Sequence, residues 1–368
     1  MRTMLIKNLG IIVTGNTPSK SEPEFYNSND IHFIKPDLIG NTGITQINHS
    51  KEYISEKARN KARVVRKNTV LVTCIGNIGK VGFVEVDEVA FNQQINAIIP
   101  NKYVLPRYLA YALLANQQRL ESIANAPVVP IINKTQFENF DLSIHDDLTE
   151  QDKITRILDN ISKELMFRQK QINEYDQIIK SRFVEMFESF KKTDLSNIAE
   201  IIMGQSPDSA YYNENGVGLP FFQGKADFGS KYTNVSYWTT KPSKTAKKGN
   251  VLMSVRAPVG PVNISSVECC IGRGLCSINA IPNKTNNEFL YNALIAIQDQ
   301  ITAMGTGSTF KAINKSDVYA IQLPLAPISL QNEFANFVEQ VDKLKFVVQQ
   351  SLDEMQKLFD SLMQKYFG

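Results

Sequence analysis

The chain has 368 residues, of which 43% are hydrophobic and 21% charged, and this is the composition of an ordinary soluble protein of two or three domains. The formal net charge is +3, which is compatible with DNA but is smaller than the charge of strong nonspecific nucleic-acid binders. Its apolar runs are too short to cross a bilayer and its start has no secretory signal, so we expect a cytoplasmic protein without membrane contact.

The first part of the chain reads as β-rich. A short apolar strand leads into the turn Gly15-Asn16-Thr17-Pro18-Ser19. Further strands are predicted at Ile31 to Ile34 and at Val70 to Thr73. A glycine-containing turn, Gly76-Asn77-Ile78-Gly79-Lys80, follows the second of them. Short helical segments come next, and together these elements predict an α+β domain.

A long helix follows this domain. Apolar residues between Ile154 and Met186 recur in alternating steps of four and three, which is the seam of a coiled coil. The stretch contains neither proline nor glycine, so nothing interrupts it. The seam residues that we assign to this helix are Ile154, Leu158, Ile161, Leu165 and Ile172.

The second half of the chain repeats the first with an offset near 181 residues. Gly204-Gln205-Ser206-Pro207 matches the opening turn at an offset of 189 residues, and from Val251 to Ser254, which matches the strand at Val70, the offset is 181. Ile313-Asn314-Lys315 matches Ile132-Asn133-Lys134. A shared offset over this many residues indicates an internal repeat. The second helix has its own seam, which consists of Phe334, Val338, Val341, Val348 and Leu352.

We therefore predict an α+β fold with two β-rich domains, residues 1–147 and 191–327, each followed by a long helix, residues 148–190 and 328–368. Each helix carries an apolar stripe that its own length cannot bury, so we expect the two to pack as an antiparallel coiled coil. That packing would turn the tandem repeat into a pseudo-twofold molecule. At 1.5 Å per residue each helix would span about 55–60 Å, or about one and a half turns of B-DNA.

No catalytic motif is present in the sequence. It has no phosphate-binding loop of the Gly-x4-Gly-Lys-Ser/Thr type and no Gly-x-Ser-x-Gly turn. It also lacks the Asn/Asp-Pro-Pro-aromatic motif of an amino-methyltransferase. The four cysteines and three histidines have no metal-site or redox spacing, so we expect no metal and reduced, buried thiols. The sequence favours two binding units on a rigid spacer over an enzyme.

The chain resembles the specificity subunit of type I restriction–modification systems, over essentially its whole length. The resemblance rests on the two opening turns, on residues Gly305 to Lys315, on Leu323-Pro324-Leu325-Ala326-Pro327, and on a glutamine near the start of each helix, Gln151 and Gln331. The first half departs in part, because Ala124 to Pro130 replaces the Gly-Ser-Thr stretch of the second.

The resemblance implies that the chain is not an enzyme and holds no cofactor. Each recognition domain would read one half of a bipartite double-stranded DNA site, and the helices would set the gap and bind adenine methyltransferase subunits. S-adenosylmethionine, ATP and magnesium would belong to those subunits and to a motor/nuclease subunit. The alternatives are a stand-alone DNA-binding regulator, which would bind DNA strongly by itself, and a protein scaffold that binds no DNA.

The DNA-contacting residues are predicted on turns. Base reading needs side chains that pair donors with acceptors, whereas lysines suit phosphates. The base-reading candidates are Asn77, Gln93, Gln94, Gln205, Gln223, Lys225, Arg256 and Arg273, and the phosphate candidates are Lys20, Lys35, Lys80, Lys244, Lys247 and Lys248. For each, the alternative is an ordinary exposed polar residue.

Arg256 and Arg273 lie among apolar residues, so the alternative for them is a structural salt bridge. Arg256 follows the strand that begins at Val251 and corresponds to Ile75 in the first half. We expect Arg256 to contact guanine, because an arginine on a loop can donate two hydrogen bonds to that base.

Overall fold

A computed structural model describes residues 1–124, 129–306 and 311–368. Parts of two sequence motifs, residues 125–128 and 307–310, lie outside the described residues. The chain divides into two compact units. Unit 1 comprises Met1–Gln169 and Gln350–Gly368, and unit 2 comprises Lys170–Gln349. The predicted α+β class, with β-rich domains and long helices, is confirmed.

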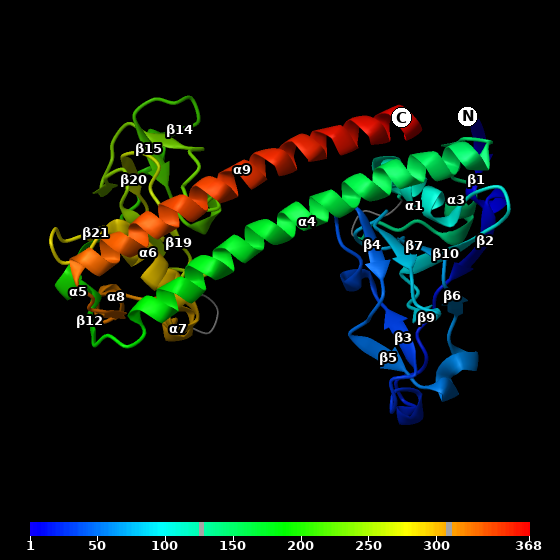
Figure 1. Cartoon of the computed structure of the whole chain (residues 1–368), viewed down its shortest axis with the longest axis horizontal. Helices are drawn as coiled ribbons and strands as arrows, with labels where there is room; N and C mark the ends of the chain where they lie inside the picture. Colours follow the sequence, from blue (N-terminus) through cyan, green and yellow to red (C-terminus); the bar gives the residue numbers. More distant parts are fainter. Residues whose placement is uncertain (125–128, 307–310) are drawn as a thin grey trace. The chain divides into compact units, whose positions relative to one another are not determined.

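Unit 1 contains a five-stranded and a four-stranded sheet (Figure 1). The first has the strand order β2 (Gly10–Thr14), β10 (Ile95–Pro100), β7 (Val70–Thr73), β8 (Val81–Val84) and β4 (Ile44–Ile47). The second has the order β5 (Glu52–Ile54), β3 (Ile31–Ile34), β9 (Glu88–Phe91) and β6 (Val64–Arg66). A separate antiparallel pair joins β1 (Arg2–Leu5) to β11 (Asp141–Ile144). The short helices are η1 (Ile6–Asn8), η2 (Pro23–Phe25), η3 (Pro36–Leu38), η4 (Glu56–Lys61), α1 (Pro106–Ala115), α2 (Gln117–Ser122) and α3 (Lys134–Glu138).

Unit 2 also contains a four-stranded and a five-stranded sheet. Its four-stranded sheet has the order β13 (Ala199–Met203), β21 (Leu275–Ala280), β18 (Val251–Ser254) and β19 (Val262–Ile264). Its five-stranded sheet has the order β14 (Tyr212–Asn213), β16 (Trp238–Thr239), β15 (Leu219–Phe222), β20 (Cys269–Ile271) and β17 (Thr245–Ala246). β12 (Lys192–Asp194) pairs with β22 (Gln322–Pro324). The short helices are α5 (Leu195–Ile198), η5 (Ser209–Tyr211), η6 (Lys225–Asp227), α6 (Asn287–Ala296), α7 (Gln298–Met304) and α8 (Lys315–Tyr319).

The central strand of each unit lies between two apolar cores. Side chains alternate between the two faces of a strand, so Val70 and Val72 of β7 enter one core while Leu71 enters the other. In β18, Val251 and Met253 enter one core and Leu252 the other. This double burial explains why both strands are continuous apolar runs rather than alternating ones.

The repeated Ile-Asn-Lys motif is a helix start. Asn133 caps α3, where its side chain accepts a hydrogen bond from the backbone of Gln136, whose own side chain accepts one in return. Asn314 caps α8 in the same reciprocal way with Asp317. The motif is therefore explained by local capping chemistry rather than by ligand binding.

The long helices are α4 (Leu148–Phe187) and α9 (Ile328–Phe367), and each contributes to both units (Figure 1). In unit 1 the beginning of α4 shares a core with the end of α9. In unit 2 the end of α4 packs against the beginning of α9, where the ring centroids of Phe183 and Phe334 lie 5.5 Å apart. The two helices therefore run antiparallel within each unit. Within the described residues, none of the helices combines the length and the apolar character needed to span a membrane.

The ten assigned seam residues are buried or half-buried in the structure. The seam also includes polar pairs, because Lys345 Nζ lies 2.5 Å from Asp176 Oδ1. Such a pair favours one register of the two helices over a slipped one.

Charged side chains also join each domain to its helix. In unit 1, Arg107 of α1 lies 2.7 Å from Asp159 of α4. In unit 2, Lys231 lies 2.9 Å from Glu288 of α6 and 2.5 Å from Asp342 of α9. Burial disfavours the charge of Lys231, but the two carboxylates outweigh it and raise the pKa of Lys231 above its usual value. The lysine therefore stays protonated and fastens α9 to its domain.

A buried glutamine fixes the first turn of each long helix. Gln151 Oε1 accepts from the backbone N–H of Leu105, and its Nε2 donates to the carbonyls of Tyr103 and His145. Gln331 is placed in the same way in unit 2, with Thr285 as a donor and the carbonyls of Lys284 and Ala326 as acceptors. The two glutamines are thus structural anchors.

We predict that Gln331→Ala destabilises unit 2. The change leaves buried donors and acceptors unpaired, at a cost of about 2 kcal/mol, which lowers the melting temperature by roughly 4–8 °C for a unit of this size. Thermal unfolding followed by circular dichroism measures this, with the exposed Asn336→Ala on the same helix as control. Equal melting temperatures for the two variants would contradict the anchoring role.

Candidate functional site

The opening turn of each unit crosses over a five-residue segment that contains a β-turn. Gly15 N–H donates to the carbonyl of Ile95 and Asn16 N–H to that of Phe91. A Cβ on Gly15 would lie 2.2 Å from the carbonyl oxygen of Asn92. Only glycine allows this close approach, which explains why the motif begins with glycine.

Unit 2 has the same crossing. Gly204 N–H donates to Leu275 and Gln205 N–H donates to Ile271. A Cβ on Gly204 would lie 2.1 Å from the carbonyl oxygen of Gly272. The crossed turns are therefore residues 91–95 in unit 1 and 271–275 in unit 2. We call them the crossed turns below.

Gln93 and Arg273 occupy the middle of the two crossed turns, and both side chains are exposed. The hydroxyl of Thr17 donates to Gln93 Oε1 at 2.8 Å. In unit 2 the hydroxyl of Ser206 instead accepts from the backbone N–H of Arg273 at 3.2 Å. The hydroxyl residue of the opening motif therefore fixes a side chain in one unit and a backbone in the other.

The strand ends beside the crossed turns are equivalent as well. Cys74 N–H donates to the carbonyl of Gln94, as Val255 N–H does to that of Gly274. The next residue, Ile75 or Arg256, forms an isolated bridge with Ile131 or Ala312. The structure therefore places Arg256 at the position of Ile75.

Arg256 is exposed and has no ion-pair partner within the part of the chain that the structure describes. Arg273 has none among these residues either. The acidic neighbour that a structural salt bridge would require is thus missing from the described residues around both arginines.

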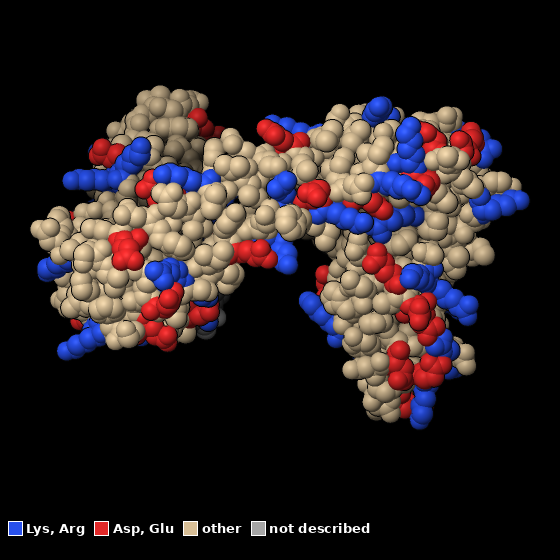
Figure 2. Space-filling model, viewed as in Figure 1, with Lys and Arg blue, Asp and Glu red and all other residues tan. Residues whose placement is uncertain are grey.

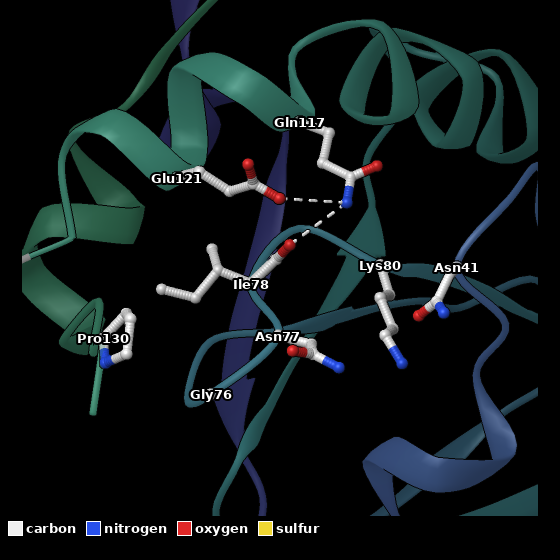
Figure 3. Close-up of a pocket in the computed structure, with 8 residues that line it drawn as sticks. All are labelled: Asn41, Gly76, Asn77, Ile78, Lys80, Gln117, Glu121 and Pro130. Atoms are coloured by element: carbon white, nitrogen blue, oxygen red, sulfur yellow. Dashed lines mark hydrogen bonds between the residues drawn. The ribbon is translucent and has the colours of Figure 1, made fainter. Parts of the chain in front are cut away.

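Asn77 and Lys80 border a hollow of 450 Å³ in unit 1 (Figure 3). Asn77 is exposed, whereas Lys80 is half-buried. Gln117 of α2 holds their loop, because its Nε2 donates to the carbonyl of Ile78 and to Glu121 Oε1. The hollow is also bordered by Asn41. A polar, open hollow of this kind can accept hydrogen-bonding groups from outside.

The corresponding loop of unit 2 carries different chemistry. Pro258 and Pro261 stand where unit 1 has Asn77 and Lys80. The loop is still fixed to the neighbouring helix, because the hydroxyl of Thr302 donates to the carbonyl of Val259. The two units therefore share the attachment of this loop to the neighbouring helix, but they differ in the side chains that the loop exposes.

Of the other candidates of unit 2, Gln205, Gln223 and Lys244 contact its crossed turn. The carbonyl of Gln205 accepts from the hydroxyl of Ser243, and that of Lys244 accepts from Ile271 N–H. Gln223 lies against Gly272 and Gly274, so close that a Cβ on Gly274 would be 2.4 Å from its carbonyl oxygen. The side chains of Gln205, Gln223, Lys225, Lys244, Lys247 and Lys248 are exposed.

The remaining candidates of unit 1 differ in their surroundings. Lys20 is exposed. Lys35 is half-buried in an ion pair with Glu52, which occupies its ammonium group. Gln94 is half-buried, and its Oε1 accepts from Asn92. The structure therefore gives Lys35 and Gln94 internal partners, whereas the side chains of Lys20, Asn77 and Gln93 are exposed.

The side chains at the crossed turns can donate and accept hydrogen bonds, but they have no arrangement for catalysis. All four cysteines are buried, and burial raises the pKa of Cys276 to about 12, so its thiol is not a nucleophile near neutral pH. No group of three or more metal-binding side chains occurs among the described residues. Basic and acidic side chains are interspersed on the face shown in Figure 2.

Sequence reasoning missed Thr17 and Asn41. Thr17 belongs to a motif that was identified only as a turn, and its contact with Gln93 joins residues 76 positions apart. Asn41 lies in a loop without a sequence signal. The recurrence of Gly-x-Thr/Ser-Pro was the one clue, since it pairs a hydroxyl with a glycine that permits close approach.

We predict that Gly204→Ala distorts the crossed turn of unit 2. Relief of a 2.1 Å contact with a backbone oxygen requires the backbone to shift, at about 1–3 kcal/mol. Denaturant unfolding measures the cost. Gly224→Ala is the matched control, because a Cβ there meets nothing within 4 Å. Equal stability of the two variants would show that the close approach is not required.

A family model for the type I restriction modification DNA specificity domain matches residues 1–174 and 187–355 of the chain. The MjaX putative type I restriction enzyme specificity subunit of Methanocaldococcus jannaschii is 34% identical over 314 residues, covering 78% of this chain and 74% of the relative. The HindI specificity subunit of Haemophilus influenzae is 37% identical over 97 residues, covering 26% of this chain and 20% of the relative.

Solved structures share the fold. The type I restriction–modification S subunit from M. genitalium has a TM-score of 0.62 at 16% identity, covering all of this chain and 96% of its own. A chain from a structure of type I system assembly and conformational transition has a TM-score of 0.59 at 24% identity, covering 99% of this chain and 97% of its own.

Proposed function

The chain belongs to the type I restriction–modification DNA specificity family, and we propose that each of its two units reads one half of a bipartite DNA site. It is a non-catalytic subunit that recognises DNA sequence as part of a complex. The proposal rests on the two crossed turns. Their backbone hydrogen bonds are equivalent in the two units, but the exposed side chains that they hold are different. Two domains with the same backbone structure and different exposed side chains suit a DNA site whose two halves differ in sequence.

The contacts divide by chemistry. Exposed amides and guanidinium groups at the crossed turns and strand ends suit base edges, whereas Lys20, Lys244 and Lys247 suit phosphates. The mild net charge of +3 supports a subunit that gains affinity from its partners.

The long helices bind the partner subunits in this proposal. Large apolar residues are exposed at equivalent positions of both helices. In unit 1 these are Met166, Phe167 and Leu358, and in unit 2 they are Phe346, Val347 and Ile178. Phe346 and Val347 also border a hollow of 470 Å³ together with Tyr232. Repeated apolar surface of this kind fits two copies of one partner.

We assign these two copies to adenine methyltransferase subunits, which would bring S-adenosylmethionine. A motor/nuclease subunit would bring ATP and magnesium. The present chain then needs no cofactor of its own. The direct test is co-expression with the methyltransferase and mapping of methylated adenines. A split motif is expected, and methylation without sequence preference would sink the proposal.

We predict that Arg256→Ala relaxes one position of the half-site read by unit 2. The lost guanine contact is worth about 1–3 kcal/mol in discrimination. The melting temperature should stay within about 1 °C, because the side chain is exposed and has no ion pair among the described residues. Methylation mapping and thermal unfolding measure the two effects. A large fall in melting temperature with an unaltered motif would make Arg256 structural instead.

We predict that the helices set the gap between the half-sites. Seven residues inserted after Ile172 and seven after Val348 keep the seam in register in both antiparallel helices. Each helix grows by about 10 Å, and the gap should lengthen by about three base pairs. The single insertion after Val348 should reduce activity, because its partner has no matching length. If the variant with both insertions keeps full activity and an unchanged gap, the helix length does not determine the distance between the half-sites.

We predict that Phe346→Asp removes one methyltransferase copy and that Met166→Asp removes the other. A carboxylate in an apolar contact is costly to desolvate. Native mass spectrometry of the purified complex counts the copies. Gln340→Asp, at another exposed position of α9, is the control and should retain both. Retention of both copies by the two single variants would place the docking surface elsewhere.

A further inference from the structure

The crossed turns are equivalent residue by residue. Residues 91–95 and 271–275 have the same length and are closed by corresponding bonds, from Ile95 N–H to Asn92 and from Leu275 N–H to Gly272. In both units the opening motif and the neighbouring strand end form hydrogen bonds with corresponding residues of the crossed turn. The middle residue, Gln93 or Arg273, therefore occupies one position of a shared frame.

The two middle side chains are presented differently. Thr17 donates to Gln93 Oε1 at 2.8 Å, which fixes the orientation of the carboxamide. Its two N–H donors and the second lone pair of Oε1 remain available. Ser206 contacts only the backbone of Arg273, and the guanidinium has no ion pair among the described residues. Both side chains thus carry a paired set of hydrogen-bonding groups outward.

We propose that Gln93 reads adenine and Arg273 reads guanine, at corresponding positions of the two half-sites, and that Thr17 is the positioning residue of Gln93. A carboxamide matches the N6 donor and N7 acceptor of adenine, whereas a guanidinium matches the O6 and N7 acceptors of guanine. A good bidentate contact discriminates by about 5- to 150-fold against the wrong base. This assignment rests on the proposed function and adds the bases to it.

The position of Thr17 strengthens the assignment. A flexible glutamine loses rotamer freedom when it binds, and a side chain that is already held loses less. Thr17 holds the carboxamide through its oxygen, so the amide nitrogen faces away from the protein contact.

The experiment exchanges the two side chains in the full complex. The chain is co-expressed with its methyltransferase, and methylated motifs are mapped for Gln93→Arg and Arg273→Gln. Gln93→Arg should change one base of one half-site from adenine to guanine, at a position other than the methylated adenine. Arg273→Gln should make the reverse change in the other half-site. Gln118→Arg, on the exposed surface of α2, is the matched control and should leave the motif unchanged.

Thr17 is tested through Gln93. Thr17→Val removes the donor but keeps the shape, and it should relax the same base position as Gln93→Ala, by a smaller factor. Thr17→Ser keeps the hydroxyl and should restore the parent preference. Relaxation at other positions, or none with Thr17→Val, would overturn the positioning role.

Several outcomes overturn the assignment. These are an unchanged motif in Gln93→Arg, changes at scattered positions or in both halves, and the same change in the Gln118→Arg control. Where a variant methylates too weakly to map, its purified complex is titrated with duplexes altered one base pair at a time, and a uniform loss over all positions counts against the assignment. A parent complex that methylates without a split motif would overturn the proposed function as well, whereas a split motif that ignores Gln93→Arg overturns the base assignment alone.

Discussion

In unit 1, Phe359 and Phe367 from the end of the chain lie in the same apolar core as Ile154 and Leu158 from its middle. The ring centroids of Tyr108 and Phe367 are 5.2 Å apart, so the last helical turn contacts the domain directly. Burial of one such side chain contributes about 1.5–3 kcal/mol. The N-terminal unit therefore has an incomplete core until the C-terminal helix has formed. Unit 2 has the converse arrangement, because the end of the first helix and the start of the second complete its core.

Because each domain core needs residues of both long helices, the position of each domain is coupled to the packing of the helices. In unit 1 the short helix α1 contacts the long helix α4 through the ion pair of Arg107 with Asp159. In unit 2 the short helix α6 is linked to the long helix α9 through Lys231, which pairs with Glu288 of α6 and with Asp342 of α9. A domain that is attached by apolar burial and by half-buried ion pairs has little freedom to rotate relative to its helix. The crossed turns are thus held by the element that sets their spacing in the proposed function.

The fold was readable from the sequence because its signals are local or repeated. The heptad steps through Ile154 and Phe334 predict the helices, and the recurrence of Gly15 and Gly204 reveals the repeat. For the candidate site, the sequence predicted only which loops carry the residues and not which residues contact one another. The contact between Thr17 and Gln93 joins two turns through tertiary packing, and the ion pair of Lys35 with Glu52 joins two strands, so neither has a local sequence signal.

The net charge of the chain is modest. Lysines and arginines number 40 against 37 acidic residues, and the two signs are interspersed on the face shown in Figure 2. Nonspecific affinity for DNA grows with the number of phosphates neutralised, so a surface of mixed sign holds duplex DNA weakly by itself. Weak nonspecific binding favours discrimination, because directional contacts such as those of Gln93 and Arg256 then make up a larger share of the total. In the proposed complex the methyltransferase subunits would supply further phosphate contacts, and the exposed turns of the specificity subunit would contact base edges.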